Sequence, residues 1–301
     1  MDQSKSAIIC TLLVSFVLTL FSARAALGSD EPSLKPFILA GSDPGTIDAK
    51  VDEIKAALAP EGFQVVGDYQ PYPGARIVVV TSEALKNSAA KSKFGAYGAI
   101  QRISITETPT GIQVAYTNPL YMAQLYRMND SLAETAAGLE KALGKKSEFG
   151  STDGISASKL RKYHYMVMMP YFTDPIKLAT YKSQDEATQT VEANLAARKE
   201  GTFKVYRVDV PGKKESVFGV GLTEGDGADA VVMKVIDKGE LKHTAHLPYE
   251  LVVSGGVVYM LHGRFRIASD FPDLTMGTFM KISDAPSGIE KKLTLIAKGK
   301  D

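Results

Sequence analysis

The stretch LYMAQLYRMND (Leu120–Asp130) has a counterpart later in the chain, LTMGTFMKISD (Leu274–Asp284). Leu, Met and Asp stand at the same offsets in both, and Leu/Phe, Arg/Lys, Met/Ile and Ala/Gly pair as similar residues. Two further pairs of blocks match in the same order along the chain, IKAALA with VEANLA and LEKAL with IEKKL. The repeat is far longer than that of a solenoid, so it predicts a duplicated domain.

Each copy shows the same succession of patterns: a strand, a helix, two strands, a short helix, a hairpin and closing helical segments. Turns that contain Pro and Gly separate the strands, and glycine supplies the positive φ of the hairpin turns. The pattern predicts an α+β fold in two tandem copies. The expected ranges are strand 37–40, helix 46–59, strands 63–69 and 76–81, helix 82–91 and hairpin 101–106 with 112–116, then strand 165–169, helix 185–199, strands 203–210 and 216–222, helix 228–237 and hairpin 249–253 with 257–261.

Two helix starts carry capping boxes, in which a serine and a glutamate three residues later satisfy free N–H groups of the first turn. These are Ser183 with Glu186, and Ser131 with Glu134. Methionine-bearing stripes at helical spacing occur in both copies, and core packing is the expected role of both. Their members are Met122, Leu125, Tyr126 and Met128 in the first copy, and Met276, Phe279 and Met280 in the second.

The two copies are expected to span residues 34–144 and 161–298. Residues 145–160 lie between them and are rich in Gly, Ser and Lys. This composition is poor in residues that form cores and predicts a flexible or loosely packed linker.

The first 25 residues differ from the rest of the chain. Lys5 precedes an unbroken apolar run, 7–21, which ends at Ala23-Arg24-Ala25. A charged start, a short apolar core and a small-x-small exit predict a cleaved secretory signal, 1–25. A retained anchor is the alternative, but it needs about 20 apolar residues. We therefore expect a soluble periplasmic protein, without a lipid anchor because no small residue directly precedes Cys10.

Composition narrows the possible functions of the expected mature chain. Its only cysteine would be removed with the signal, which excludes disulfides, thiolate metal sites and cysteine nucleophiles. The whole chain has 35 Lys and Arg and 34 Asp and Glu, and removal of Asp2, Lys5 and Arg24 leaves 33 of each. Because no basic excess remains, we expect no nucleic-acid partner. No later segment is apolar for long enough to span a membrane, so we also expect no stable membrane insertion after cleavage.

The stretch RIVVVTSEALKNSAAKSKFGAYGAIQRISITETPTGIQVAYTNP (76–119) resembles the bacterial family named domain of unknown function 302. The second copy, GADAVVMKVIDKGELKHTAHLPYELVVSGGVVYML (227–261), resembles a divergent member and has Leu247-Pro248 before its hairpin, where the first copy has Ala99-Ile100. The resemblance implies a small module with a curved, mainly antiparallel sheet covered by helices on one face. It implies no activity, because the family offers no catalytic residues to carry over.

No motif for nucleotide binding, serine hydrolysis or haem attachment is present: the sequence has no P-loop, GxSxG or CxxCH. Gly219–Glu224 begins like a dinucleotide loop, but a glutamate replaces the third glycine, which favours a strand end. We expect no cofactor. Catalysis ranks below binding because no pairing of a nucleophile with a base is legible, although carboxylates that meet only in the fold stay open.

Two polar clusters each have a structural and a functional interpretation. His243 and His246 could place two imidazoles on one face of a turn, but the glutamate of an HExxH site is missing and solvated loop histidines are favoured over zinc. The segment Arg264–Arg266, with Asp270 and Asp273, could hold an anionic group. A solvated strand edge with local ion pairs is favoured there.

One metal hypothesis comes from the strand expected over 165–169. On that strand His164, Met166 and Met168 would share a face, and imidazole and thioether groups suit Cu(I). The opposing interpretation is that both methionines are flexible core filler beneath the helix 185–199, and it is favoured.

These patterns predict an exported module whose most favoured role is non-catalytic binding or assembly. Its ligand would be a small apolar molecule or a protein, held in the groove between the copies or on an open sheet face. Periplasmic copper handling through the His/Met strand is the alternative.

Overall fold

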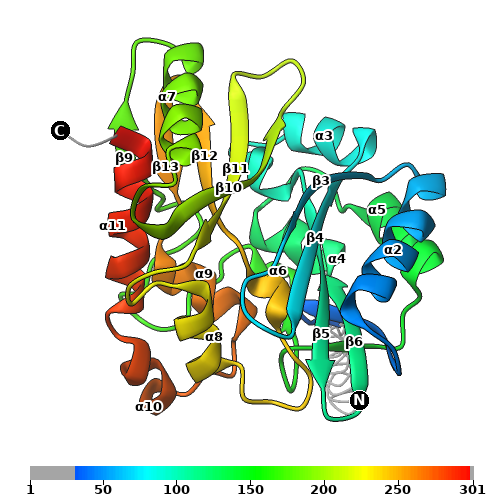
Figure 1. Ribbon diagram of the computed structural model, residues 1–301. Coiled ribbons are helices and arrows are strands. Elements are labelled where there is room, and N and C mark those ends of the chain that lie inside the picture. The colour runs from blue at the N-terminus through cyan, green and yellow to red at the C-terminus, as the bar shows by residue number, and fades with distance from the viewer. Residues whose placement is uncertain (1–30, 299–301) are drawn as a thin grey trace, which may run out of the picture. The chain divides into compact units, whose positions relative to one another are not determined.

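A computed structural model describes residues 31–298 of the chain, which have an α+β fold with antiparallel sheets (Figure 1). Its first half contains β1 Ser33–Leu34, β2 Phe37–Asp43, α2 Ile47–Leu58, η2 Ala59–Glu61, β3 Gln64–Tyr69, β4 Ala75–Thr81, α3 Glu83–Ala90, η3 Gly95–Gly98, β5 Gln101–Thr108, β6 Gly111–Thr117, α4 Pro119–Leu125 and α5 Ala133–Leu143.

The second half follows a short connection. The connection contains β7 Ser147–Phe149, β8 Ile155–Ser156 and α6 Ala157–Leu160. The second half contains β9 Ile176–Thr180, α7 Gln184–Ala196, η4 Lys199–Gly201, β10 Thr202–Asp209, β11 Glu215–Leu222, α8 Asp229–Ile236, η5 Thr244–His246, β12 Tyr249–Ser254, β13 Val257–Met260, α9 Gly263–Asp270, α10 Met276–Phe279, η6 Met280–Ile282 and α11 Ala285–Lys298.

The two larger sheets share one strand order. The first runs β3-β4-β5-β6-β2-β7 and the second β10-β11-β12-β13-β9, while β1 and β8 form a separate pair. Bulges also fall at corresponding places: Val66 between β3 and β4 matches Val205 between β10 and β11. Likewise Ala40 of β2 and Leu178 of β9 are the bulged residues opposite β6 and β13.

Helices cover one face of each large sheet, as predicted. In the first half α2 packs against β4 and β5, and α5 lies beside α2 (Figure 1). In the second half α7 contacts β10 and β12, and α11 packs along α7 (Figure 1). Amphipathic helices bury one apolar stripe in this way, here through residues such as Val51 and Ile54 in α2.

The opposite face of each sheet is covered by the other half. The short helix η5 packs on β5 and β6 of the first sheet, and η3 packs on β11 and β12 of the second. A small apolar cluster marks the first of these contacts, where Ala245 joins Phe37, Leu39 and Phe149. The expectation of an open sheet face for ligand binding is therefore wrong.

The edge strands β3 and β10 approach each other closely between the halves. A Cβ added at Gly67 would lie only 2.8 Å from the backbone oxygen of Val205. Glycine is thus required where the two backbones meet, since any larger residue would push the strands apart.

The strand predicted over 165–169 is absent. These residues form turns, and the strand in that place of the sheet order is β9. Met168 is 97% exposed and Val167 is 82% exposed, so these residues do not belong to the core either. An apolar run alone does not distinguish a strand from an exposed loop, and Pro170 and Pro175 nearby favour the loop.

The serine half of one predicted capping box forms, and the other box does not form. Ser183 accepts a hydrogen bond from the backbone N–H of Glu186, whose carboxylate accepts one from Lys182 N. The helix α5, however, begins after Leu132, which has a positive φ of 56°. Asp130 Oδ1 accepts the hydrogen bond from Leu132 N, so the turn is capped one residue before Ser131.

The segment 145–160 is more ordered than its composition suggests. Its strand β7 pairs with β2 and extends the first sheet, and β8 pairs with β1. Phe149 and Leu160 are buried. The expectation of loose packing is wrong because two apolar residues among many polar ones are enough to anchor it.

The two methionine stripes lie in different environments. Met122 is buried on α4, which directly follows β6, whereas Met276 is 41% and Met280 is 60% exposed. The helix that directly follows β13 is α9, not α10. Core packing of the second stripe and its structural pairing with the first are therefore wrong: the similar letters fall at different places in the succession of elements.

Within residues 31–298, no helix is long and apolar enough to cross a membrane. The predicted signal, its cleavage site and Cys10 lie outside the described residues.

Candidate functional site

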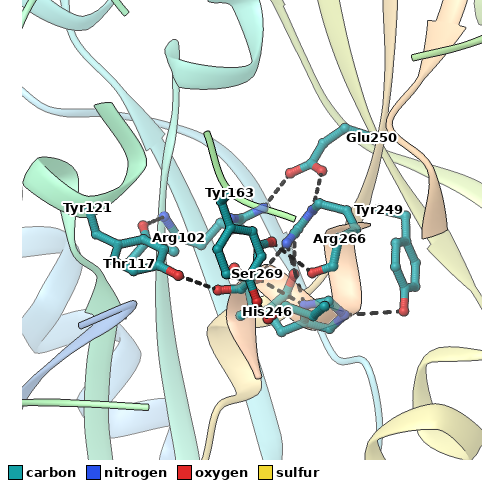
Figure 2. Close-up of polar contacts among 11 residues, drawn as sticks. Arg102, Thr117, Tyr121, Tyr163, His246, Tyr249, Glu250, Arg266 and Ser269 are labelled. Carbon is teal, nitrogen blue, oxygen red and sulfur yellow. Dashed lines mark hydrogen bonds and ion pairs between the residues drawn. The ribbon is translucent and has the colours of Figure 1, made fainter. Parts of the chain in front are cut away.

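A network of buried charges lies between the two halves (Figure 2). Arg102 of β5 pairs through Nη1 with Glu250 of β12, and the second oxygen of Glu250 accepts a hydrogen bond from Arg266 Nε at 3.1 Å. Arg266, on α9, also pairs with Asp270 one turn later. All four side chains are 5% exposed or less. Since buried ions require partners, the halves are held by a matched set of two cations and two anions.

His246 of η5 adds the Tyr249 hydroxyl to the network. Its Nδ1 lies 2.9 Å from Asp270 Oδ2 and its Nε2 lies 3.2 Å from the Tyr249 hydroxyl (Figure 2). Burial lowers the pKa of His246, and the hydrogen bond to Asp270 offsets this only in part. The ring is thus neutral: Nδ1–H donates to the carboxylate, which can only accept, and Nε2 accepts from Tyr249.

Burial by itself would raise the pKa of Asp270, but the Arg266 charge and the His246 hydrogen bond lower it further than burial raises it. A hydrogen bond to the backbone also joins the two halves here: Tyr121 from α4 donates to the carbonyl of Ser269 at 2.7 Å (Figure 2). The network joins β5 and α4 to β12 and α9. Since its charged groups are enclosed, its role is to fix the two halves in one arrangement.

A second buried carboxylate lies nearby, at the start of α8. Asp229 accepts hydrogen bonds from the Tyr69 hydroxyl and Leu222 N, both at 3.3 Å. Burial raises its pKa to about 8, although both hydrogen bonds act in the opposite direction. The carboxyl group is therefore protonated at neutral pH, unlike an ordinary aspartate.

The more accessible arrangement is a histidine–aspartate pair in a cleft between the halves. His243 Nδ1 lies 3.0 Å from Asp237 Oδ1, and Asp237 Oδ2 also accepts from His243 N at 2.9 Å. A carboxylate only accepts, so Nδ1 carries the proton and Nε2 is the ring nitrogen left for a ligand.

The cleft has a volume of about 460 Å³ and an aromatic wall. The His243 ring stacks on Phe271 with centroids 4.7 Å apart and meets the edge of Phe149 at 5.4 Å. Leu241 and Ile236 add aliphatic surface. Aromatic and aliphatic walls with a few polar groups are typical of small-molecule sites.

The prediction that His243 and His246 are solvated loop residues is wrong. His246 is fully buried and His243 is largely buried, and each has its own aspartate partner. They are not solvated loop residues: His243 directly precedes η5, His246 is the last residue of η5, and each has a different partner. Among residues 31–298, no group of three or more His, Cys, Asp and Glu is placed to hold a metal ion.

The favoured interpretation of the segment around Arg266 was also wrong. Gly263–Asp270 is a helix rather than a strand edge, and Arg266 and Asp270 are buried in the network described above. Asp273 instead lines the aromatic cleft, where it accepts hydrogen bonds from the backbone and hydroxyl of Thr152.

The candidate copper ligands lie in an exposed turn. His164 Nδ1 is 2.7 Å from the backbone oxygen of Met166, and the His164 ring packs against Tyr171. Because no strand forms there, the alternation that would place His164, Met166 and Met168 on one face does not apply. The alternative of core filler is wrong for Met168, which is almost fully exposed.

Comparisons with family models, with curated proteins and with solved structures find no match to this chain.

Proposed function

We propose that the protein is an exported, non-catalytic binding module made of two tandem copies, which holds a small apolar molecule in the aromatic cleft between them. The observation that carries the proposal is the cleft wall formed by Phe149, His243 and Phe271. A volume of about 460 Å³ lies within the range of small-molecule sites, roughly 300–1,000 Å³.

The tandem-copy part of the proposal rests on topology. Five strands of each half occupy corresponding places in their sheet, and bulges interrupt corresponding strand pairs. A shared strand order with shared bulges is expected from duplication, since bulges are retained within families. Under this proposal each copy is a relative of the domain of unknown function 302 family, which assigns it no chemistry.

Binding is favoured over catalysis by how the polar groups are used. The charges of the buried network pair with one another, and neither Arg102 nor Glu250 lines the cleft. The His243–Asp237 pair could orient a base, but within residues 31–298 no hydroxyl group hydrogen-bonds to the His243 ring. Nucleophilic catalysis needs such a contact.

The test uses N-phenyl-1-naphthylamine, a neutral aromatic probe whose fluorescence rises in apolar sites. The proposal expects saturable binding to the protein and at least tenfold weaker binding to Leu241→Asp, which places a charge on the cleft wall. The matched control is Ala137→Asp, which puts the same charge beside a different cleft of about 470 Å³. Equal binding by both variants would refute the cleft as the site.

A protein partner is the second candidate, and an exposed apolar surface favours it. The turn after His164 and the helix α10 line one small crevice, and Tyr165 donates to the carbonyl of Leu274 across it. Flexible methionine-rich surfaces adapt to protein partners. The exposed members are Met166, Val167, Met168, Tyr171, Met276 and Met280.

A further inference from the structure

We infer that the molecule held in the aromatic cleft is an amphipathic anion, whose charged group is bound by Lys238 while its apolar body lies against the aromatic wall. This inference rests on the proposed function and names the ligand class of the same site.

Lys238 lies where two clefts meet. It lines the aromatic cleft and also a second cleft of about 540 Å³, which lies between Tyr72 of the first half and α8 of the second. Asp237 lines the second cleft and its partner His243 lines the first. The two clefts therefore adjoin at Lys238 and at this histidine–aspartate pair, with the aromatic wall on one side.

The polar groups of the aromatic cleft differ in whether the protein already pairs them. The carboxylates of the aromatic cleft are already used by protein donors: Asp273 accepts from Thr152, and Glu148 accepts from Asn118 and Lys145. Asp237 likewise accepts twice from His243. Each of these carboxylates is thus already paired with donors of the protein itself.

Two lysine ammonium groups of the clefts, unlike the carboxylates of the aromatic cleft, are unpaired within residues 31–298. Lys238 is exposed, and its ammonium group makes no hydrogen bond or ion pair with any residue of the described range 31–298; the same holds for the ammonium group of Lys234. The ammonium group of Lys242 donates to the carbonyl of Gly239. Two carboxylates line the second cleft with these three lysines: Glu107, which is exposed, and Asp237, which is paired with His243. The ammonium groups of Lys238 and Lys234 are thus available to a ligand, and an anion is the group that they bind.

The site therefore combines an aromatic wall, one imidazole nitrogen and ammonium donors at its edge. A carboxylate or sulfonate on an aromatic or aliphatic body matches the wall and the ammonium donors, whereas Nε2 of His243, which accepts, is left for a donor group of the ligand. Because the lysines are exposed, water and salt screen them, and each contributes a modest factor rather than most of the affinity.

The experiment compares two probes with one aromatic body. They are 8-anilinonaphthalene-1-sulfonate, which carries the anion, and N-phenyl-1-naphthylamine, which lacks it. Lys238→Ala is expected to weaken binding of the sulfonate about threefold to fivefold at low salt. The same variant should leave binding of the neutral probe within about twofold. In 0.5 M salt the difference should largely vanish.

The matched control is Lys291→Ala, which removes an exposed lysine of α11 outside both clefts. This variant should change the binding of neither probe. Equal weakening of both probes by Lys238→Ala would show that Lys238 shapes the cleft rather than binding the anion, and no weakening of either would also overturn the inference. Failure of the neutral probe to bind the parent protein would instead count against the proposed function, and the sulfonate would still report on Lys238.

Discussion

Replacement of Glu250 by alanine should be among the most damaging single changes in the chain. Glu250 is the only carboxylate that pairs with Arg102 in the described residues, and Arg102 is 1% exposed. Arg266 would keep Asp270 as its partner. The variant therefore leaves one buried guanidinium without a counter-charge.

The expected loss of unfolding free energy is about 3–5 kcal/mol, the usual penalty for breaking a buried ion pair from one side. A typical domain has only about 5–15 kcal/mol in total, so the change should be visible as a large fall in the urea midpoint. The double variant Arg102→Met with Glu250→Leu removes both charges and should recover most of the loss.

Glu53→Ala provides the control, because Glu53 pairs with Lys50 on the surface and its side chain is 66% exposed. It should cost less than about 1 kcal/mol. A loss below about 1 kcal/mol for Glu250→Ala, or a double variant no more stable than the single one, would refute the assignment of the network as the link between the halves.

Asp229, the exposed methionines Met166 and Met168, and the amino terminus each lead to one further prediction. Asp229 has its pKa raised to about 8 by burial, against about 3.9 when unfolded, so its contribution to stability is lost as pH rises from about 4 through 8. Asp229→Asn should flatten that decline in urea titrations, and an unchanged pH profile would contradict it. Met166→Leu with Met168→Leu should compete for Cu(I) against a chromogenic chelator as the parent does, whereas weaker retention would support the copper hypothesis. Intact-mass measurement on periplasmic protein should give an amino terminus at Ala26, and a full-length membrane species would argue against export.

Local elements were predictable because local sterics and periodicity decide them. The helix expected at 46–59 is found as Ile47–Leu58, and Thr46 caps it by accepting a hydrogen bond from Ala49 N. The second hairpin was expected at its glycine turn, where Gly255 and Gly256 both have positive φ. These features depend on neighbours in the chain, so the sequence alone contains them.

Apolar runs were less informative than periodic ones. Residues 165–169 carry strand-like letters, yet the strand is Ile176–Thr180, where Leu178 is buried between partly exposed neighbours. Likewise the sequence around Met276 is similar to that around Met122, but Met276 is exposed whereas Met122 is buried. A hydrophobic residue is more stable when it is buried, but whether another surface packs against it depends on the tertiary structure.

The site itself was decided by tertiary structure. The sequence by itself determined the α+β class, the order of the elements in each half and the absence of recognisable catalytic motifs. Arg102 and Glu250 are 148 residues apart, and no local pattern marks either as half of an ion pair. Even His243 and Asp237, only six residues apart, pair because the chain turns back between α8 and η5. Hydrogen bonds and ion pairs act over a few ångströms, so which groups they join depends on how the two halves dock and not on their spacing along the chain.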